Sequence, residues 1–186
     1  IALSDQVSFP WFAPAGTRRG GITNASATGH INSEGEFVSS ALNEGQRDTL
    51  YSNNVNPITF ITGAGLVNYG QKTRFAGSSS LDRINVSRLV IYLRSQLNKL
   101  ARPYVFEPND KITRDEIKAQ AESLLLELVG NRAIFDFLVV CDETNNTPTR
   151  IDRNELYLDI AIEPVKAVEF IYVPLRLKNT GEIAGL

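Results

Sequence analysis

Apolar residues recur at helical spacing over residues 84–100, and this is the strongest pattern in the chain. Six of them fall on one stripe of a 3.6-residue helix: Val86, Leu89, Val90, Leu93, Leu97 and Leu100. Pro103 and Pro108 follow, and proline disfavours helical geometry in the residue before it. We therefore predict a core-facing helix that ends near Leu100.

Two further helices are indicated by their start signals. Thr113 and Glu116 have the spacing of a capping box, apolar residues then repeat at helical spacing, and Gly130 is a typical stop signal. Asn43 and Gln46 have the same capping-box spacing, which predicts a shorter helix after Asn43.

Several stretches have the pattern of strands. Ile58 to Ile61 and then Gly63 to Gly70 read as a strand, a turn and a second strand. Ile134 to Cys141 is a β-rich run that ends apolar on both faces, which predicts a central strand. Residues 155–163 alternate between apolar and polar side chains, as in a half-buried strand. Val168 to Leu177 predicts a last strand, and Pro174 within it indicates a sheet edge.

The sequence therefore predicts an α/β (α+β) fold in which a mixed, largely antiparallel β-sheet packs against two main helices. Residues 1–40 are rich in glycine and proline, so we expect an irregular, turn-rich segment that is the edge or remnant of a preceding domain. Residues 41–178 would form the main domain and 179–186 a C-terminal arm. Trp11 is expected to anchor the turn-rich segment to the core.

Composition narrows the class of protein. A chain of 186 residues with 42% hydrophobic content suits one domain with its own core. The net charge is -2 and the basic residues are scattered, which argues against nucleic-acid binding. No apolar run approaches the roughly 18 residues of a membrane helix. A lone Cys141 excludes a disulfide framework and suits a buried position, and Ile1 as the first residue indicates a fragment of a longer chain.

The sequence contains few of the residue patterns that a catalytic site needs. The only histidine, His30, lies in a polar, glycine-rich stretch, so Ser–His and Cys–His pairs would all depend on it. Residues 65–73 resemble a phosphate-binding loop, but Gln71 separates the second glycine from the lysine that such a loop needs. We expect no catalytic residue, no cofactor and no metal.

Two other functions stay open at this point. One is a carboxylate-based hydrolase that uses an acidic set without calcium-loop spacing: Asp142, Glu143, Asp152 and Glu155. The other is a monomeric module that binds a carbohydrate or a protein through the loop around Trp11 and Phe12.

Six segments in series resemble a known family. They are PWFAPAGTRRGGI, VNPITFITGAGLVNYGQKTR, INVSRLVIYLRSQL, YVFEPND, FDFLVVCDETNNTP and IDRNELYLDIAIEPVKAVEFIYV. Their order and spacing are similar to the C-terminal conserved region of contractile tail sheath proteins of large myophages, with relatives in contractile bacteriocins and other injection machines.

The resemblance implies a structural subunit and not an enzyme. Sheath proteins polymerise as stacked hexameric rings around the tail tube and contract to drive the tube through the host envelope. The implied partners are neighbouring sheath subunits, the tail tube protein, and baseplate and tail terminator proteins, with no nucleic acid or membrane. The implied location is the virion tail, assembled in the bacterial host cytoplasm.

Two sets of contact residues are expected. An edge strand followed by a tail suits strand addition to a neighbouring subunit, and we expect the exchanged segment to be Val173, Pro174, Leu175, Arg176, Leu177 and Lys178. The mixed charge on the polar face of the second helix suits a weak contact with the tube: Arg114, Asp115, Lys118 and Glu122.

Overall fold

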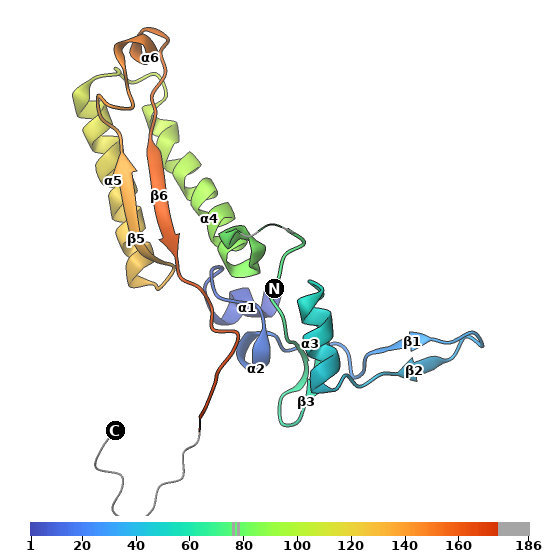
Figure 1. Cartoon of the computed structure of the whole chain (residues 1–186). Coiled ribbons are helices and arrows are strands. Elements are labelled where there is room, and N and C mark those ends of the chain that lie inside the picture. The colour runs from blue at the N-terminus through green and yellow to red at the C-terminus, as the bar shows by residue number, and fades with distance from the viewer. Residues whose placement is uncertain (76, 78, 175–186) are drawn as a thin grey trace, which may run out of the picture.

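The computed structural model describes residues 1–75, 77 and 79–174. The helices are α1 (Ala2–Val7), α2 (Gly16–Arg19), α3 (Glu44–Ser52), α4 (Ile84–Ala101), α5 (Lys111–Gly130) and α6 (Pro148–Asp152), with 3₁₀ turns η1 (Ser80–Asp82) and η2 (Arg102–Tyr104). The strands are β1 (Gly29–Ile31), β2 (Phe37–Ser39), β3 (Ile58–Ile61), β4 (Gly65–Asn68), β5 (Ile134–Val140) and β6 (Asp159–Pro164). An elongated part holds α4, α5, β5 and β6, and the other strands lie with α1, α2 and α3 at its lower end (Figure 1).

Helix α4 forms as its apolar stripe predicts. Val86, Leu89 and Leu93 are buried along one side of the helix. The helix ends at Ala101, where η2 places Pro103 in a tight first turn that tolerates its missing N–H. The predicted end near Leu100 is confirmed to within one residue.

Helix α5 starts earlier than predicted, and the expected capping box at Thr113 and Glu116 is wrong. Asp110 is the N-cap, because its carboxylate accepts a hydrogen bond from the Thr113 N–H at 2.9 Å. That bond also holds the pKa of Asp110 below its usual value. Gly130 is the last helical residue, as its position as a stop signal indicates.

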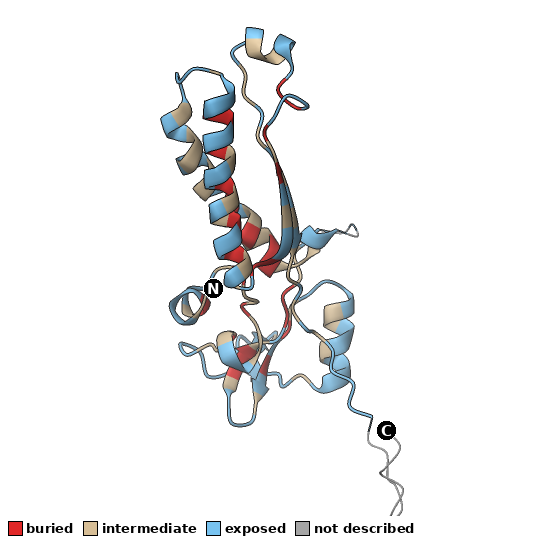
Figure 2. Ribbon diagram, turned by 90° about the vertical axis from the view of Figure 1, so that its left-hand side faces the viewer, coloured by how far each residue is buried: buried red, intermediate tan, exposed pale blue. Residues whose placement is uncertain are grey.

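The main core lies where α4 and α5 meet the β5–β6 hairpin. Buried residues of the helices gather on the side that faces the strands (Figure 2). Leu89, Leu125 and Leu128 from the helices pack in one cluster with Ile134 and Val139 of β5. The predicted α/β (α+β) class with two main helices is confirmed, but the described residues form three separate two-stranded antiparallel sheets in place of the one mixed, largely antiparallel sheet that the sequence predicted.

Strand β5 differs from its predicted central position. It pairs antiparallel with β6, with Phe137 opposite Ile162, and has no second neighbour in the described part of the chain. Phe135 and Leu138 are more than 60% exposed on it. Strand β6 begins at Asp159 and not at 155, although the apolar alternation over 155–163 holds as partial burial.

The N-terminal segment is more ordered than predicted, since it forms α1, α2 and the β1–β2 hairpin, which projects away from the body (Figure 1). Trp11 confirms the expected anchor, because it is 6% exposed and belongs to the main core cluster. Its indole N–H donates to the Asn131 carbonyl at 3.0 Å. The ring stacks on Phe9 and meets Tyr92 edge-on.

The strand, turn and strand predicted over 58–70 is confirmed as β3 and β4, which pair antiparallel. The predicted helix after Asn43 is also confirmed as α3, with both hydrogen bonds of the Asn43–Gln46 capping box present. None of the helices within the described residues is long and apolar enough to cross a membrane.

Strand β4 is also joined to the N-terminal segment. The Ile22 N–H donates to the Leu66 carbonyl, and the Asn68 N–H donates to the Gly20 carbonyl, both at 2.8 Å. A Cβ atom at Gly20 would lie 2.5 Å from the Asn68 carbonyl oxygen and 2.8 Å from backbone atoms of Gly16. Only glycine fits there without moving backbone.

Gly20→Ala should therefore lower the free energy of unfolding by about 1–3 kcal/mol, the usual cost of overpacking. Urea unfolding followed by circular dichroism measures it. The control is Gly45→Ala in exposed α3, where the nearest atom is 3.7 Å away and the loss of backbone entropy should favour alanine by about 0.5–1 kcal/mol. Equal effects of the two substitutions would refute the close approach at Gly20.

Candidate assembly site at the C-terminal segment

The chain leaves the core after β6 as an extended segment, residues 165–174, which we call the exit segment (Figure 1). The Val165 N–H donates to the Ala133 carbonyl at 3.0 Å. The sequence predicts a strand from Val168 to Leu177. Over its described part, Val168 to Pro174, this prediction is wrong, because no strand is assigned there. Leu175, Arg176, Leu177 and Lys178 of the predicted exchange segment, and the predicted arm 179–186, lie outside the described residues.

The exit segment carries apolar side chains with little cover. Val168, Phe170, Ile171, Tyr172 and Val173 are each between 64% and 88% exposed. Aromatic and β-branched residues favour strands, yet this run has no strand partner among the described residues. Extended backbone with exposed apolar side chains is a template for pairing with another chain.

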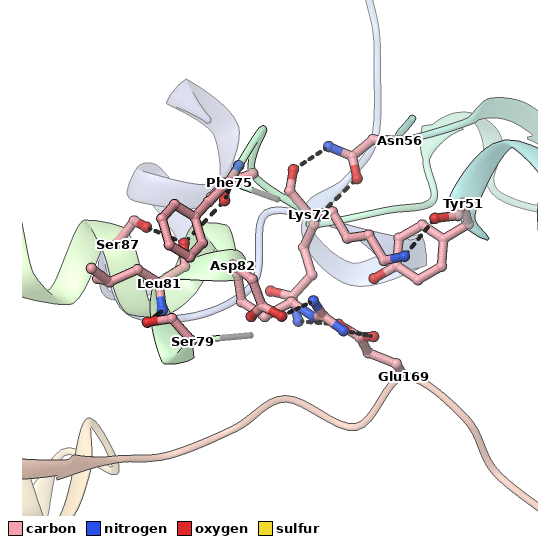
Figure 3. Close-up of polar contacts among 12 residues, drawn as sticks. Tyr51, Asn56, Lys72, Phe75, Ser79, Leu81, Asp82, Ser87 and Glu169 are labelled. Atoms are coloured by element: carbon pink, nitrogen blue, oxygen red, sulfur yellow. Dashed lines mark hydrogen bonds and ion pairs between the residues drawn. The ribbon is translucent and has the colours of Figure 1, made fainter. Parts of the chain in front are cut away.

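One charged residue in this run is held to the body. The Glu169 carboxylate accepts hydrogen bonds from Arg83 at two guanidinium nitrogens, Nε at 2.5 Å and Nη2 at 3.0 Å (Figure 3). It also accepts from Gln71 Nε2 at 3.1 Å. The Glu169 side chain is 16% exposed, in contrast to the apolar neighbours on both sides of it.

The surroundings of Glu169 favour the ionised form of its carboxyl group. Burial would raise the pKa of Glu169, but the hydrogen bonds from Arg83 and Gln71, together with the nearby Tyr51 hydroxyl, outweigh burial, and the pKa lies below its usual value. Burial, together with the adjacent Glu169 carboxylate, raises the pKa of Tyr51. Glu169 is therefore an anion and Tyr51 a neutral phenol at neutral pH.

The loop that carries Gln71 is itself fixed. Asn56 exchanges two hydrogen bonds with the backbone of Lys72, both at 2.8 Å. The Lys72 ammonium donates to the Tyr51 carbonyl at 2.6 Å and lies 4.4 Å from the centre of the Tyr51 ring. Lys72 is thus engaged within the fold.

A groove of about 690 Å³ runs between the start of α4 and the exit segment, lined by Arg83, Asn85, Lys166 and Phe170 among others. Asn85 is 4% exposed, and its amide donates to the Val165 carbonyl at 3.2 Å. Val165 is therefore held through both its N–H and its carbonyl, which fixes where the exit segment begins.

Of the four α5 residues predicted to face the tube, only some have exposed side chains. Arg114 is buried at 7% exposure and donates to the carbonyl and the side-chain oxygen of Asn109, so its expected place on the exposed polar face is wrong. Asp115 pairs with Lys111 at 2.7 Å, and Lys118 lies 4.0 Å from Glu122, in each case with at least a third of both side chains exposed. Asp115, Lys118 and Glu122 are therefore accessible to a partner.

Asp142 and Trp11, one from each of the two alternative functions, serve local structure. Asp142 accepts hydrogen bonds from both the N–H and the hydroxyl of Thr144, which lower its pKa. No group of three or more His, Cys, Asp or Glu side chains within the described ranges could hold a metal ion. Trp11 is buried, so its ring offers no binding platform.

Cys141 is 1% exposed, as predicted, and burial raises the pKa of its thiol.

Comparison with known families decides the class of protein. Residues 77–178, more than half of the chain, match the sequence model of the phage tail sheath C-terminal domain. The chain belongs to the phage tail sheath family. The match covers α4, α5, the β5–β6 pair and the exit segment, so Arg83 and Glu169 lie within the sheath domain, whereas Tyr51 and Gln71 precede the matched residues.

Curated sheath proteins of myophages are similar over the whole chain. The tail sheath protein of Vibrio phage KVP40 is 38% identical over 188 residues, which is 99% of this chain and 26% of that protein. The tail sheath protein of Enterobacteria phage T4 is 35% identical over 192 residues, which is 100% of this chain and 27% of that protein. The chain thus spans about a quarter of the length of these sheath relatives.

Solved structures share the sheath fold at lower identity. A chain of the anti-feeding prophage baseplate covers 95% of this chain with a TM-score of 0.78 and 21% identity, and 47% of that chain is matched. A chain of the contracted PVC sheath complex, from an extracellular contractile injection system, covers 94% with a TM-score of 0.75 and 18% identity, and 48% of that chain is matched. These similarities show the fold.

Proposed function

We propose that this chain is the C-terminal part of a structural sheath subunit that polymerises as stacked hexameric rings around a tail tube and contracts to drive the tube through the host envelope. The observation that carries the proposal is the exit segment, a run of exposed strand-forming residues at the end of a sheath-family domain. Such a segment is suited to joining subunits and has no catalytic chemistry of its own. The role is structural and not enzymatic.

The proposed joint is strand addition between copies. The exit segment, with predicted residues up to Lys178, would add to the β5–β6 sheet of a neighbouring subunit. That sheet has two strands among the described residues, so both of its edges offer backbone groups for pairing. Each backbone hydrogen bond would contribute about 0.5–1.5 kcal/mol net. A strand link keeps subunits joined while their bodies rotate as rigid units during contraction.

The proposed partners and location follow from this role. The partners are neighbouring sheath subunits, the tail tube protein, and baseplate and tail terminator proteins. Support for self-assembly and baseplate contact comes from the similar folds in a helical sheath and a baseplate of the anti-feeding prophage. The place of action is the virion tail, after assembly in the cytoplasm of the bacterial host. Nucleic acid and membrane have no part in the proposed role.

Electron microscopy of the complete parent protein tests the proposal. The protein is expressed alone and beside a matching tube protein, and each sample is imaged. Helical tubes of stacked rings are the expected result. Monodisperse monomers under both conditions would contradict a sheath role.

For the tube contact we propose the accessible polar residues of α5, namely Asp115, Lys118 and Glu122. Lys118→Glu should reduce co-assembly of tube and sheath at low salt. The new glutamate would repel Glu122, and the surface would lose the positive charge that makes it mixed. Co-sedimentation with tubes measures the effect. Lys99→Glu, on the exposed side of α4, is the matched control. Unchanged co-assembly of the Lys118 variant would count against this surface.

A further inference from the structure

The exit segment is fixed to the body at two points. Val165 is held by Ala133 and Asn85, and Glu169 is held by Arg83 and Gln71. Between and beyond these points the apolar side chains are exposed. The direction of the chain beyond Glu169 therefore depends on the Glu169 contact.

The partners of Glu169 come from separate stretches of the chain. Tyr51 lies in α3, Gln71 in the loop after β4, and Arg83 immediately before α4. Gln71 is 3% exposed, and its carbonyl accepts a hydrogen bond from the Ile84 N–H at 2.8 Å. Arg83 Nη1 also pairs with Asp82 at 2.8 Å. The acceptor on the exit segment thus meets donors that are already held in place.

The geometry suits a clamp more than a general surface attraction. Two guanidinium nitrogens donate to the two oxygens of one carboxylate, which fixes orientation as well as distance. The contact is mostly shielded from solvent, so salt screens it less than an exposed pair. Holding a segment in its bound direction lowers the entropy lost when it binds a partner.

We propose that Glu169 and Arg83 form a clamp that sets the direction in which the exit segment leaves the body and so positions it for a neighbouring copy. This role rests on the proposed sheath function. Glu169 is a positioning residue in this scheme, and the exposed apolar residues after it make the contact between copies. The clamp joins the exit segment to the base of α4, so it ties the path of the link to the orientation of the sheath domain.

The test uses the complete parent protein with Glu169→Ala, Glu169→Gln, and the exchanged pair Glu169→Arg with Arg83→Glu. Glu163→Gln, an exposed acid on β6, is the matched control. The first readout is the initial rate of chymotrypsin cleavage after Phe170 and Tyr172 in dissociated subunits, with sites identified by mass spectrometry. The second readout is tube formation by electron microscopy, and circular dichroism confirms folding.

The expected result is a cleavage rate at least about 5-fold higher for Glu169→Ala, since release of the clamp makes local opening easier. Tubes should be absent or irregular, Glu169→Gln should be intermediate, and the exchanged pair should restore part of both readouts. Glu163→Gln should match the parent.

Unchanged cleavage in Glu169→Ala would overturn the clamp while leaving the sheath role intact. Faster cleavage with normal tubes would overturn its positioning role. Failure of the unaltered parent to form tubes would overturn the sheath function and this inference with it, and the cleavage rates would still report whether the contact holds the segment.

Discussion

Replacing Trp11 by alanine is expected to lower the free energy of unfolding by about 3–5 kcal/mol, the range for removing a large buried aromatic side chain. Trp11 lies in the main core cluster with Leu89 and Leu125, and it stacks on Phe9. Its loss leaves a cavity and frees the N-terminal segment from α4 and α5. Urea unfolding monitored by circular dichroism measures the change.

Two variants separate the parts of this effect. Trp11→Phe keeps an aromatic ring but leaves the Asn131 carbonyl without its indole donor, so a smaller loss of about 1–3 kcal/mol is expected. Phe106→Ala is the control, because Phe106 is fully exposed and its loss should change stability by less than about 0.5 kcal/mol. If Trp11→Ala were as mild as Phe106→Ala, the N-terminal segment would not be part of the core.

Deleting Pro174 to Leu186 from the complete parent protein should leave a folded subunit that does not polymerise. The last side-chain contact described for the exit segment is that of Glu169, so stability should change by less than about 0.5 kcal/mol. Loss of several backbone hydrogen bonds between copies, at about 0.5–1.5 kcal/mol each, should weaken association by at least about 100-fold. Sedimentation velocity and electron microscopy measure these effects.

The matched control replaces residues 174–186 by a glycine–serine sequence of equal length. It should also fail to polymerise, because a flexible linker supplies length without strand-forming side chains. Full tubes from the truncated protein would show that these residues do not join the subunits.

Elements whose signals lie close together in the sequence were predictable. The stripe of α4 and the Asn43–Gln46 capping box depend on residues within one or a few helical turns, and both elements form as predicted. The predicted start of α5 is wrong because two polar residues three apart, Asp110 and Thr113, can each act as the N-cap. The aspartate takes that role by accepting the Thr113 N–H.

Features that depend on distant segments were not predictable. Arg114 occupies a polar position in the α5 pattern but is buried against Asn109, which precedes the helix. The clamp joins Arg83 to Glu169 across 86 positions, and no spacing rule links them. The exit segment has the residue pattern of a strand but no strand partner in the described chain, and no local signal in the sequence indicates this.

Near-atomic electron cryo-microscopy of tubes formed by the complete parent protein tests the central claim most directly. The account predicts that residues 168–178 of one copy lie about 4.8 Å from an edge of the β5–β6 sheet of a neighbouring copy, the spacing of paired strands. An exit segment that pairs with its own subunit, or that touches no neighbouring sheet in an intact tube, would contradict it.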